Sequence, residues 1–352
     1  MNMRAAVLHA PGDLRVEDVA VPAGLGAGEV LVRVKAAGIC GSDIGRVMVW
    51  GTYRFPTIPG HEFAGVVEEA GPDVTGLKAG DKVAVAPLMP CFKCESCQRG
   101  HYSLCDDYNF LGSRTDGGFA QFAKAPARNL IKVPDDMDLR HAAAIEPAAI
   151  ILHGIHKVNV SLSDAVMVVG AGALGYFAVQ FAKLSGANPV IAVDIDEAKL
   201  DLACSVGADI CIDANVENAA KPVLAATGGR GVDLAIECAG NNSGRELCLD
   251  AVRKQGTVLI YGSAHSDVAY KGHTFEKILR HEITVVGSWN FYSIPFPGRE
   301  WFEIVELLKS GKLIVEPFIS HSFGLDAAPD VFRKLVERSF GPYNKIVFTP
   351  NG

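Results

Sequence analysis

Short apolar stretches separated by glycine and proline fill the first 150 residues of the chain. Their lengths are those of β-strands, and the glycine and proline between them mark turns. The stretches lie at residues 5–14, 29–38, 63–71, 80–88 and 119–126. This pattern predicts an irregular, β-rich domain of small barrel-like form.

Near residue 150 the pattern changes into an alternation of strands and helices. Strands are expected at Val166–Val169, Val190–Asp194, Val232–Cys238, Thr257–Tyr261 and Ile283–Val286. Helices are expected at Ala173–Leu184, Glu197–Val206 and Ser243–Arg253. Such alternation predicts βαβ units and a parallel sheet. Beyond about residue 288 the alternation ends, and one helix at Trp301–Lys309 with scattered strands is expected.

The alternating block interrupts the β-rich part of the chain. We therefore predict an α/β protein with two domains. Residues 1–149 and 289–352 form the β-rich domain, and residues 150–288 form a doubly wound, parallel-sheet domain. Because ligands of open parallel sheets bind beyond the carboxyl ends of the strands, we expect the chemistry in the cleft between the two domains.

The amino-acid composition disfavours some classes of binding partner. The 352 residues carry 33 Lys and Arg against 40 Asp and Glu, a net charge of −7, which disfavours nucleic acids and anionic membranes. The hydrophobic fraction of 49% is typical of a folded protein. No apolar run reaches the roughly 18 residues of a membrane span, and the N-terminus lacks the apolar core of a signal peptide. We expect a cytoplasmic protein.

The segment Gly170-Ala171-Gly172-Ala173-Leu174-Gly175 is a G-x-G-x-x-G motif between an expected strand and an expected helix. In this context the three glycines allow a tight turn, close approach of a pyrophosphate and close helix–strand packing. Asp194 closes the next strand, where a carboxylate accepts hydrogen bonds from an adenosine ribose diol and repels a 2′-phosphate. The segment predicts a dinucleotide site that prefers NAD to NADP.

Four of the nine cysteines crowd into one short segment, as Cys91-x2-Cys94-x2-Cys97-x7-Cys105. Four thiolates at this spacing suit a closed tetrahedral zinc site with a structural role. An iron–sulfur cluster or a lobe of free thiols are the alternatives. Because the cysteine count is odd and no signal peptide is expected, a disulfide framework is not expected.

A second metal site is a weaker prediction from the residues alone. Cys40, His61 and Glu146 offer one thiolate, one imidazole and one carboxylate, which leaves one position on a zinc ion open. The three lie far apart in sequence, and a lone histidine or cysteine is more often an ordinary core residue. Only their combination favours a catalytic site.

The order of these motifs resembles that of the zinc-dependent medium-chain dehydrogenases along the whole chain. The motifs are Cys40-Gly-Ser-Asp, Gly60-His-Glu, the four-cysteine lobe and the glycine turn. The resemblance implies a GroES-like first domain and a Rossmann second domain. It also implies two zinc ions per subunit. Cys40, His61 and Glu146 would hold the catalytic zinc, and Glu62 would be a neighbour able to become a fourth ligand. Cys91, Cys94, Cys97 and Cys105 would hold the structural zinc.

Glu146, followed by proline, resembles the third zinc ligand of the polyol branch of this family, the sorbitol type. The segments 41–46, 87–122 and 275–301 are similar to galactitol-1-phosphate 5-dehydrogenases. The resemblance implies hydride transfer from a secondary hydroxyl of a polyol or polyol phosphate to NAD. Ser42 would hydrogen-bond the substrate oxygen. One departure is Gly45, which stands where simple alcohol dehydrogenases of the family carry a proton-relaying histidine.

Substrate-contacting residues are the least determined part of the prediction. Arg46, Arg114 and Arg299 are the candidate phosphate-binding cations, although each is equally an ordinary surface or interface arginine. Trp289 and its aromatic neighbours in the segment 289–296 line the expected cleft or pack at an interface. If no arginine faces the site, an unphosphorylated polyol is the better substrate.

Two kinds of rival function remain open. One is a dehydrogenase for another diol or amino alcohol, such as sorbitol, xylitol, galactitol, butane-2,3-diol or threonine. The other is a nucleotide-binding protein without turnover. An edge strand near Ile283–Val286 is able to pair with its copy across a two-fold axis, so a homodimer, or a homotetramer built from it, is expected.

Overall fold

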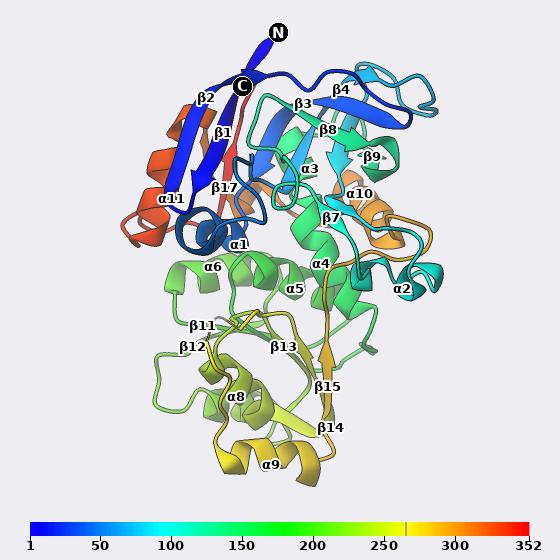
Figure 1. Ribbon diagram of the computed structural model, residues 1–352. Coiled ribbons are helices and arrows are strands. Elements are labelled where there is room, and N and C mark those ends of the chain that lie inside the picture. Colours follow the sequence, from blue (N-terminus) through cyan, green and yellow to red (C-terminus); the bar gives the residue numbers. More distant parts are fainter. Residues whose placement is uncertain (265, 352) are drawn as a thin grey trace. The chain divides into compact units, whose positions relative to one another are not determined.

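The computed structural model describes residues 1–264 and 266–351 and divides into two units. Unit 1 comprises Met1–Glu146 and Tyr292–Gly352, and unit 2 comprises Pro147–Phe291. The chain thus leaves unit 1, forms unit 2 and returns to unit 1 (Figure 1). The expected boundaries at 149/150 and 288/289 lie three residues from these divisions.

Unit 1 is built on a seven-stranded sheet of order β16-β17-β3-β4-β5-β9, with β8 also paired to β3. The ribbons β1-β2 and β6-β7 are two-stranded. The strands are β1 (Asn2–Ala10), β2 (Asp13–Ala20), β3 (Glu29–Gly38), β4 (Glu62–Ala70), β5 (Lys82–Val85), β6 (Leu88–Met89), β7 (Asn109–Phe110), β8 (Phe122–Pro126), β9 (Leu130–Lys132), β16 (Ile319–Phe323) and β17 (Lys345–Phe348).

The helices of unit 1 are short in its first segment and longer in its second. They are α1 (Gly41–Gly45), η1 (Arg46–Trp50), α2 (Glu95–Gln98), η2 (Tyr102–Leu104), η3 (Ala127–Asn129), α3 (Leu139–Ala143), α10 (Arg299–Lys309), η4 (Glu316–Phe318), η5 (Leu325–Ala327) and α11 (Ala328–Val336). Helix α4 (Ile145–Ile155) begins in unit 1 and continues in unit 2.

Helix α11 corrects the expectation of a single helix after residue 288. Ala328, Val331, Phe332 and Leu335 are buried, a spacing that places them on one face of a helix. They join an apolar core that also contains Phe119 and Phe348. A proline in the first turn of α11 is compatible with the helix, because the N–H it lacks has no partner there.

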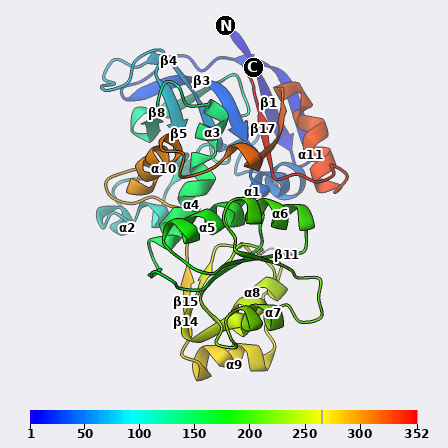
Figure 2. The ribbon, with the colours of Figure 1, turned by 180° about the vertical axis from the view of Figure 1, so that it is seen from behind.

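Unit 2 contains a six-stranded parallel sheet of order β12-β11-β10-β13-β14-β15. Its strands are β10 (Val166–Val169), β11 (Val190–Asp194), β12 (Ile210–Asp213), β13 (Val232–Glu237), β14 (Val252–Ile260) and β15 (Thr284–Gly287). Its helices are α5 (Ala173–Leu184), α6 (Glu197–Ser205), α7 (Ala220–Ala226), α8 (Asn242–Ala251) and α9 (Gly272–Arg280). Figures 1 and 2 show α5 and α6 on one side of this sheet and α7, α8 and α9 on the other.

The central strands of unit 2 are buried on both faces, which explains their continuous runs of valine, isoleucine and alanine. The reversal of strand order lies between β10 and β13, the place where a doubly wound sheet binds its ligand. The α/β prediction of a β-rich unit and a doubly wound unit is confirmed.

One disulfide departs from the expectation for the cysteines. Cys204 at the end of α6 is bonded to Cys211 in β12, with a Cα–Cα distance of 6.4 Å that lies within the usual range. The four clustered cysteines are free thiols, as are Cys40, Cys238 and Cys248. In the two described ranges, no helix is both long and apolar enough to span a bilayer.

Candidate active site and coenzyme turn

The glycine turn of unit 2 has the conformation that its sequence requires. Gly170 has a φ of +90°, which a residue with a side chain rarely adopts. A Cβ on Gly175 would lie 1.8 Å from the carbonyl oxygen of Gly170, so only glycine allows this approach of α5 to the strand. A Cβ on Gly172 would meet no atom within 4 Å. The backbone there is therefore open to a ligand.

Helix α5 begins directly after this turn, with Gly172 as its N-cap residue and Ala173 and Leu174 in its first turn. No side chain caps the helix, so its first N–H groups remain available to an anion such as a pyrophosphate.

Asp194 lies beside the turn, at the end of β11. Its Oδ2 accepts a hydrogen bond from the Ala171 N–H at 2.6 Å. Its Oδ1 accepts from the N–H groups of Ile195 at 2.8 Å and Asp196 at 3.0 Å. The carboxylate is thus fixed at the strand end next to the turn.

The four-cysteine lobe lies in unit 1, around α2. One ligand atom from each of Cys91, Cys94, Cys97 and Cys105 lies within 4.8 Å of the others. The Sγ–Sγ distances are 4.0 Å for Cys91–Cys97 and 3.9 Å for Cys94–Cys105. A tetrahedral zinc ion with bonds of about 2.3 Å places its sulfur ligands about 3.8 Å apart. The lobe fits a single metal ion, whereas the several irons of a cluster require wider spacing.

The thiols of the lobe differ in acidity. The backbone N–H of Lys93 is the main cause that lowers the pKa of Cys91 to about 6. Burial raises the pKa of Cys97 to about 12. The thiolate form of so buried a cysteine is stabilised by a cation beside it.

The second candidate metal site brings together residues from two neighbouring parts of unit 1. Cys40 precedes α1, His61 directly precedes β4, and Glu62 is the first residue of β4. One ligand atom from each of these three residues lies within 4.8 Å of the others. Ser42 donates a hydrogen bond to the Sγ of Cys40 at 3.2 Å, so its hydroxyl lies beside the thiol.

Glu146 does not belong to this group of three, although it lies close to it. Its side chain is 3% exposed, and its Oε2 has no hydrogen-bond partner in the described part of the chain. Burial raises its pKa to about 8, His61 opposes this shift, and Glu62 adds to it. An orphaned, buried carboxyl oxygen next to a thiol, an imidazole and a second carboxyl fits a divalent cation as its missing partner.

Asp43 is a site residue that the sequence analysis missed. It is fully buried, and its Oδ1 lies 3.2 Å from Nδ1 of His61, which leaves Nε2 for a metal. Burial would raise the pKa of Asp43, but His61 and Arg46 hold it below its usual range. In the sequence, Asp43 is the last residue of the CGSD motif.

The three candidate arginines have different surroundings. Arg46 donates to Asp43 at 2.8 Å, so it supports the aspartate that holds His61. Arg299 lies on α10, with its side chain 61% exposed and 3.9 Å from Glu303. Arg114 has no carboxylate partner within the described ranges, and its Nε is buried without a hydrogen bond.

The aromatic segment that follows β15 packs against the cysteine lobe. The ring of Phe296 contacts Phe92, Tyr102 and Tyr292 at centroid distances of 5.3–5.9 Å. Tyr292 is fully buried in unit 1. These contacts support the packing interpretation for this part of the segment. Trp289 belongs to unit 2 and is 56% exposed.

Gly45, the departure from the family pattern, has a structural reason. A Cβ at this position would lie 1.9 Å from the ring of Trp50. The indole therefore fills the space in which a histidine side chain would begin.

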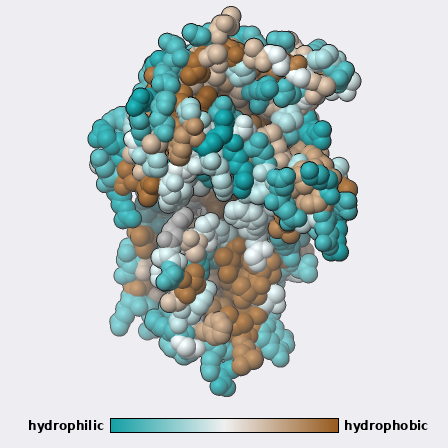
Figure 3. Space-filling model, in the orientation of Figure 1, coloured by the Kyte–Doolittle hydropathy of each residue, from teal (hydrophilic) through white to brown (hydrophobic). Residues whose placement is uncertain are grey.

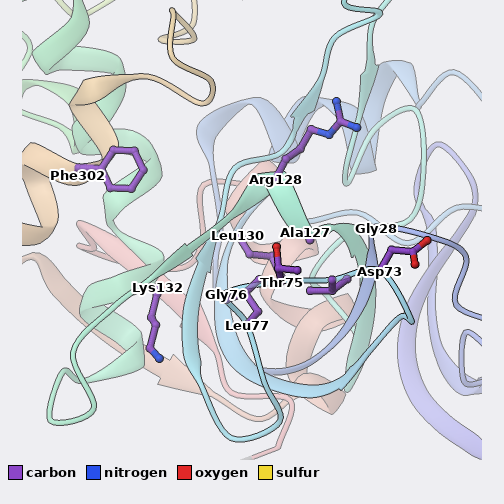
Figure 4. A pocket seen from close by; sticks show the side chains of 11 residues that line it. Gly28, Asp73, Thr75, Gly76, Leu77, Ala127, Arg128, Leu130, Lys132 and Phe302 are labelled. Carbon is purple, nitrogen blue, oxygen red and sulfur yellow. The ribbon is translucent and has the colours of Figure 1, made fainter.

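A surface hollow of unit 1 is separate from all of these groups (Figure 4). Its volume is about 520 Å³. It is lined by Gly28, Asp73, Val74, Thr75, Gly76, Leu77, Ala127, Arg128, Leu130, Lys132 and Phe302. None of the predicted site residues is among them, so this hollow is not the candidate active site.

Comparison with known proteins agrees with this geometry. The alcohol dehydrogenase GroES-like domain matches residues 26–135, and the zinc-binding dehydrogenase family matches residues 173–310. Galactitol 1-phosphate 5-dehydrogenase of Escherichia coli K12 is 36% identical over 96% of this chain and 97% of its own. The chain belongs to the zinc-dependent medium-chain dehydrogenases. The predicted family, and with it a dehydrogenase that uses zinc and a nicotinamide coenzyme, is confirmed.

Other members of the family are similar over most of the chain. Sorbitol dehydrogenase of Bacillus subtilis is 32% identical and covers 96% of this chain and 94% of its own. The crystal structure of galactitol-1-phosphate dehydrogenase from Escherichia coli matches with a TM-score of 0.93 over 99% of this chain and 100% of its own. A zinc-binding dehydrogenase from Sinorhizobium meliloti 1021 bound to NADP is 30% identical, with a TM-score of 0.90, covering 99% and 100%.

Proposed function

We propose that this medium-chain dehydrogenase oxidises a secondary hydroxyl of a polyol phosphate, of the galactitol 1-phosphate kind, and transfers the hydride to NAD. The polyol dehydrogenases among its relatives support the polyol part. The observation that carries the phosphate part is Arg114, a partly buried guanidinium without a carboxylate partner in the described structure.

The residues of unit 1 supply distinct parts of this chemistry. Cys40, His61 and Glu62, whose ligand atoms the structure brings together, would hold the catalytic zinc, with the buried carboxyl of Glu146 beside them. When bound, a zinc ion acts as a Lewis acid and lowers the pKa of a hydroxyl on it. Ser42, beside the Cys40 sulfur, would accept the hydroxyl proton and pass it to solvent. The Trp50 ring over Gly45 removes the histidine route for that proton.

Arg114 is held by aromatic rings. Its Cζ lies 4.0 Å from the ring centroid of Tyr53 and 4.4 Å from that of Tyr108. A guanidinium stacked on two rings keeps its plane fixed, and its N–H groups point outward along its edges. Two parallel N–H groups match the oxygens of a phosphate.

A row of ring contacts connects this arginine with the metal site. The Tyr108 ring contacts Phe110 at 6.5 Å, and the Phe110 ring contacts His61 at 5.7 Å. The rings of Tyr108 and Phe110 therefore lie between Arg114 and His61. This arrangement suits a substrate whose anionic group and reacting carbon lie at different positions of one chain.

Asp194 supports NAD as the coenzyme, because its carboxylate lies at the strand end where a 2′-phosphate would be repelled. The assembly that we propose is a homodimer or homotetramer in the cytoplasm. Figure 3 shows apolar side chains gathered over the part of unit 2 where β14, β15 and α9 lie. Phe275 and Leu279 on α9 and Val285 on the edge strand β15 are exposed.

The first test is a substrate panel with NAD, read as NADH formation at 340 nm. It compares galactitol 1-phosphate with galactitol, sorbitol, xylitol, butane-2,3-diol and threonine, before and after treatment with a chelator. We expect turnover of galactitol 1-phosphate above that of the free polyols, and its loss with the metal. Better turnover of a free polyol or of threonine would contradict the phosphate proposal.

The second test replaces Arg114 by methionine, with Arg299→Met as the matched control. Loss of charge-assisted hydrogen bonds costs about 1.5–3 kcal/mol, so kcat/KM for galactitol 1-phosphate falls about 10- to 150-fold. Turnover of free galactitol is expected to stay the same. The Arg299 variant is expected to behave as wild type with both substrates. An equal fall for both substrates in the Arg114 variant would show that Arg114 does not bind phosphate.

A further inference from the structure

A buried ion pair lies beneath two loops at the carboxyl ends of the strands of unit 2. Glu237 is the last residue of β13 and Arg245 lies on α8, and the two residues are 0% and 6% exposed. Nε of Arg245 lies 4.0 Å from Oε2 of Glu237. That oxygen is buried and accepts no hydrogen bond from any residue that the structure describes. Because the burial of two charges rarely adds stability by itself, this pair needs another explanation.

Each member of the pair holds one of the two loops. Oε1 of Glu237 accepts a hydrogen bond at 2.7 Å from the N–H of Gly240, in the loop that follows β13. Nη2 of Arg245 donates a hydrogen bond at 2.9 Å to the carbonyl oxygen of Gly262, in the loop that follows β14. Burial raises the pKa of Glu237, and the Gly240 N–H and Arg245 oppose this rise. The attraction between the two side chains therefore joins one loop to the other.

The two loops also contact each other directly, beside the carboxylate. A Cβ on Gly262 would lie 2.3 Å from the backbone nitrogen of Gly240 and 2.5 Å from Oε2 of Glu237. A Cβ on Gly240, whose φ is +72°, would lie 2.7 Å from the carbonyl oxygen of Ser263. Because this contact leaves no space for a side chain, a shift of either loop would move the other.

These loops lie on the side of the sheet that the adenosine does not use. A doubly wound sheet binds one mononucleotide on each side of the reversal in strand order, which here falls between β10 and β13. Since Asp194 at the end of β11 is the proposed partner of the adenosine ribose, the nicotinamide side lies beyond β13 and β14. Ala239 and Ser263 are exposed in these two loops. A Cβ on Gly170 of the coenzyme turn would lie 2.8 Å from the Ala239 nitrogen, so the first loop borders that turn.

We propose that Glu237 and Arg245 are positioning residues that fix both loops in the shape that receives the nicotinamide half of the coenzyme. A loop that is already fixed costs less free energy to order when a ligand binds to it. The buried pair supplies this order from below, while the exposed backbone of the loops stays open to the coenzyme. The inference rests on the nicotinamide coenzyme of the family and not on the substrate, so it is independent of which polyol is oxidised.

The test uses Arg245→Met and measures the binding of NADH and of ADP by isothermal titration calorimetry. ADP contains the adenosine and the pyrophosphate but no nicotinamide, so it reports on the other half of the site. We expect the affinity for NADH to fall about tenfold or more, because the released loops must be ordered on binding. The affinity for ADP is expected to stay the same, since Asp194 fixes the glycine turn separately through the Ala171 N–H.

Arg253→Met is the matched control, because Arg253 pairs with Asp233 at 2.5 Å near the opposite end of the same two strands. It is expected to lower thermal stability and to keep the wild-type ratio of NADH to ADP affinity. Arg245→Lys is a milder second variant, which keeps the charge. A single ammonium cannot face Glu237 and bind the Gly262 carbonyl through separate nitrogens, so we expect a fall of about threefold for NADH alone.

A double-mutant cycle tests whether the two residues act together. Glu237→Gln keeps an acceptor for the first loop but loses the attraction to Arg245, so it should also weaken NADH selectively. Because the pair acts as a unit, the double variant is expected to lose no more NADH affinity than Arg245→Met alone. Additive losses would show that the residues act independently and would overturn the inference.

Two results in the single variants would also overturn it. One is wild-type binding of NADH by folded Arg245→Met, or by Arg245→Lys if the methionine variant does not fold. The other is an equal fall in affinity for NADH and ADP. A polyol panel without turnover would refute the substrate proposal and leave these binding measurements intact.

Discussion

Asp194 performs two tasks at once, and replacing it by asparagine separates them. The carboxylate fixes the glycine turn through the Ala171 N–H, and it faces the place expected for the adenosine ribose. Asparagine keeps the size but loses the charge and one acceptor oxygen. If the substitution disturbs the glycine turn, the binding of NADH and of NADPH is expected to weaken equally. If it changes the contact with the ribose group, the binding of the two coenzymes is expected to change by different amounts.

The magnitude follows from the two interactions that change. A hydrogen bond from a ribose hydroxyl to a carboxylate contributes about 1.5–3 kcal/mol to binding, so its loss lowers the affinity for NADH about 10-fold or more. The charge that repels a 2′-phosphate contributes about 3 kcal/mol at roughly 5 Å and an effective dielectric constant of about 20. Because both changes favour NADPH and their factors multiply, we expect the ratio of NADH to NADPH affinity to fall about 1,000-fold or more.

The assay is a fluorescence titration with each reduced coenzyme, combined with thermal unfolding to verify the fold. Asp213→Asn is the matched control, because Asp213 ends the adjacent strand in register with Asp194. The control is expected to keep the wild-type ratio. A wild-type ratio in the folded Asp194 variant would remove this carboxylate from coenzyme selection and refute the reasoning.

Two further predictions concern stability. Burial would raise the pKa of Asp233, but hydrogen bonds from Arg230 and Arg253 hold it well below its usual range. The Asp233 carboxylate is therefore fully stabilising above about pH 4, and this contribution is lost only as pH falls through the lowered pKa of the folded protein. Asp233→Asn should cost about 3 kcal/mol at pH 7 in urea unfolding, and this cost should become steadily smaller as pH falls from about 4 to about 2. Cys94→Ser should leave one zinc per chain by elemental analysis and lower the unfolding temperature, while metal at the Cys40 site and turnover persist; two zinc ions at wild-type stability would contradict this.

The parts of the site that were predictable are those encoded by short-range spacing. The glycine turn depends on six consecutive residues, and the cysteine lobe on fifteen, so their patterns carry their geometry. A family resemblance was needed to bring Cys40 and His61 together, because only the sheet places them side by side. For Glu146 the sequence offered a ligand, and the structure places it beside the group rather than within it.

Other features required three-dimensional contacts that no pattern reveals. The three arginines look alike in sequence, but they differ in exposure and in whether a carboxylate lies within reach of the guanidinium. Asp43 was missed because its partner His61 is brought to it by the packing of segments far apart in the chain. The Trp50 ring over Gly45 likewise has no signature in the spacing of the two residues.

The return of the chain to unit 1 has a consequence for synthesis on the ribosome. Unit 2 emerges before residues 292–352, so its parallel sheet is able to fold while unit 1 is still incomplete. During that interval the end of β3 lacks its partner β17, and an unpaired strand edge is open to wrong associations. The arrival of β17 closes this edge, so the sheet of unit 1 reaches its final form only after translation has passed residue 345.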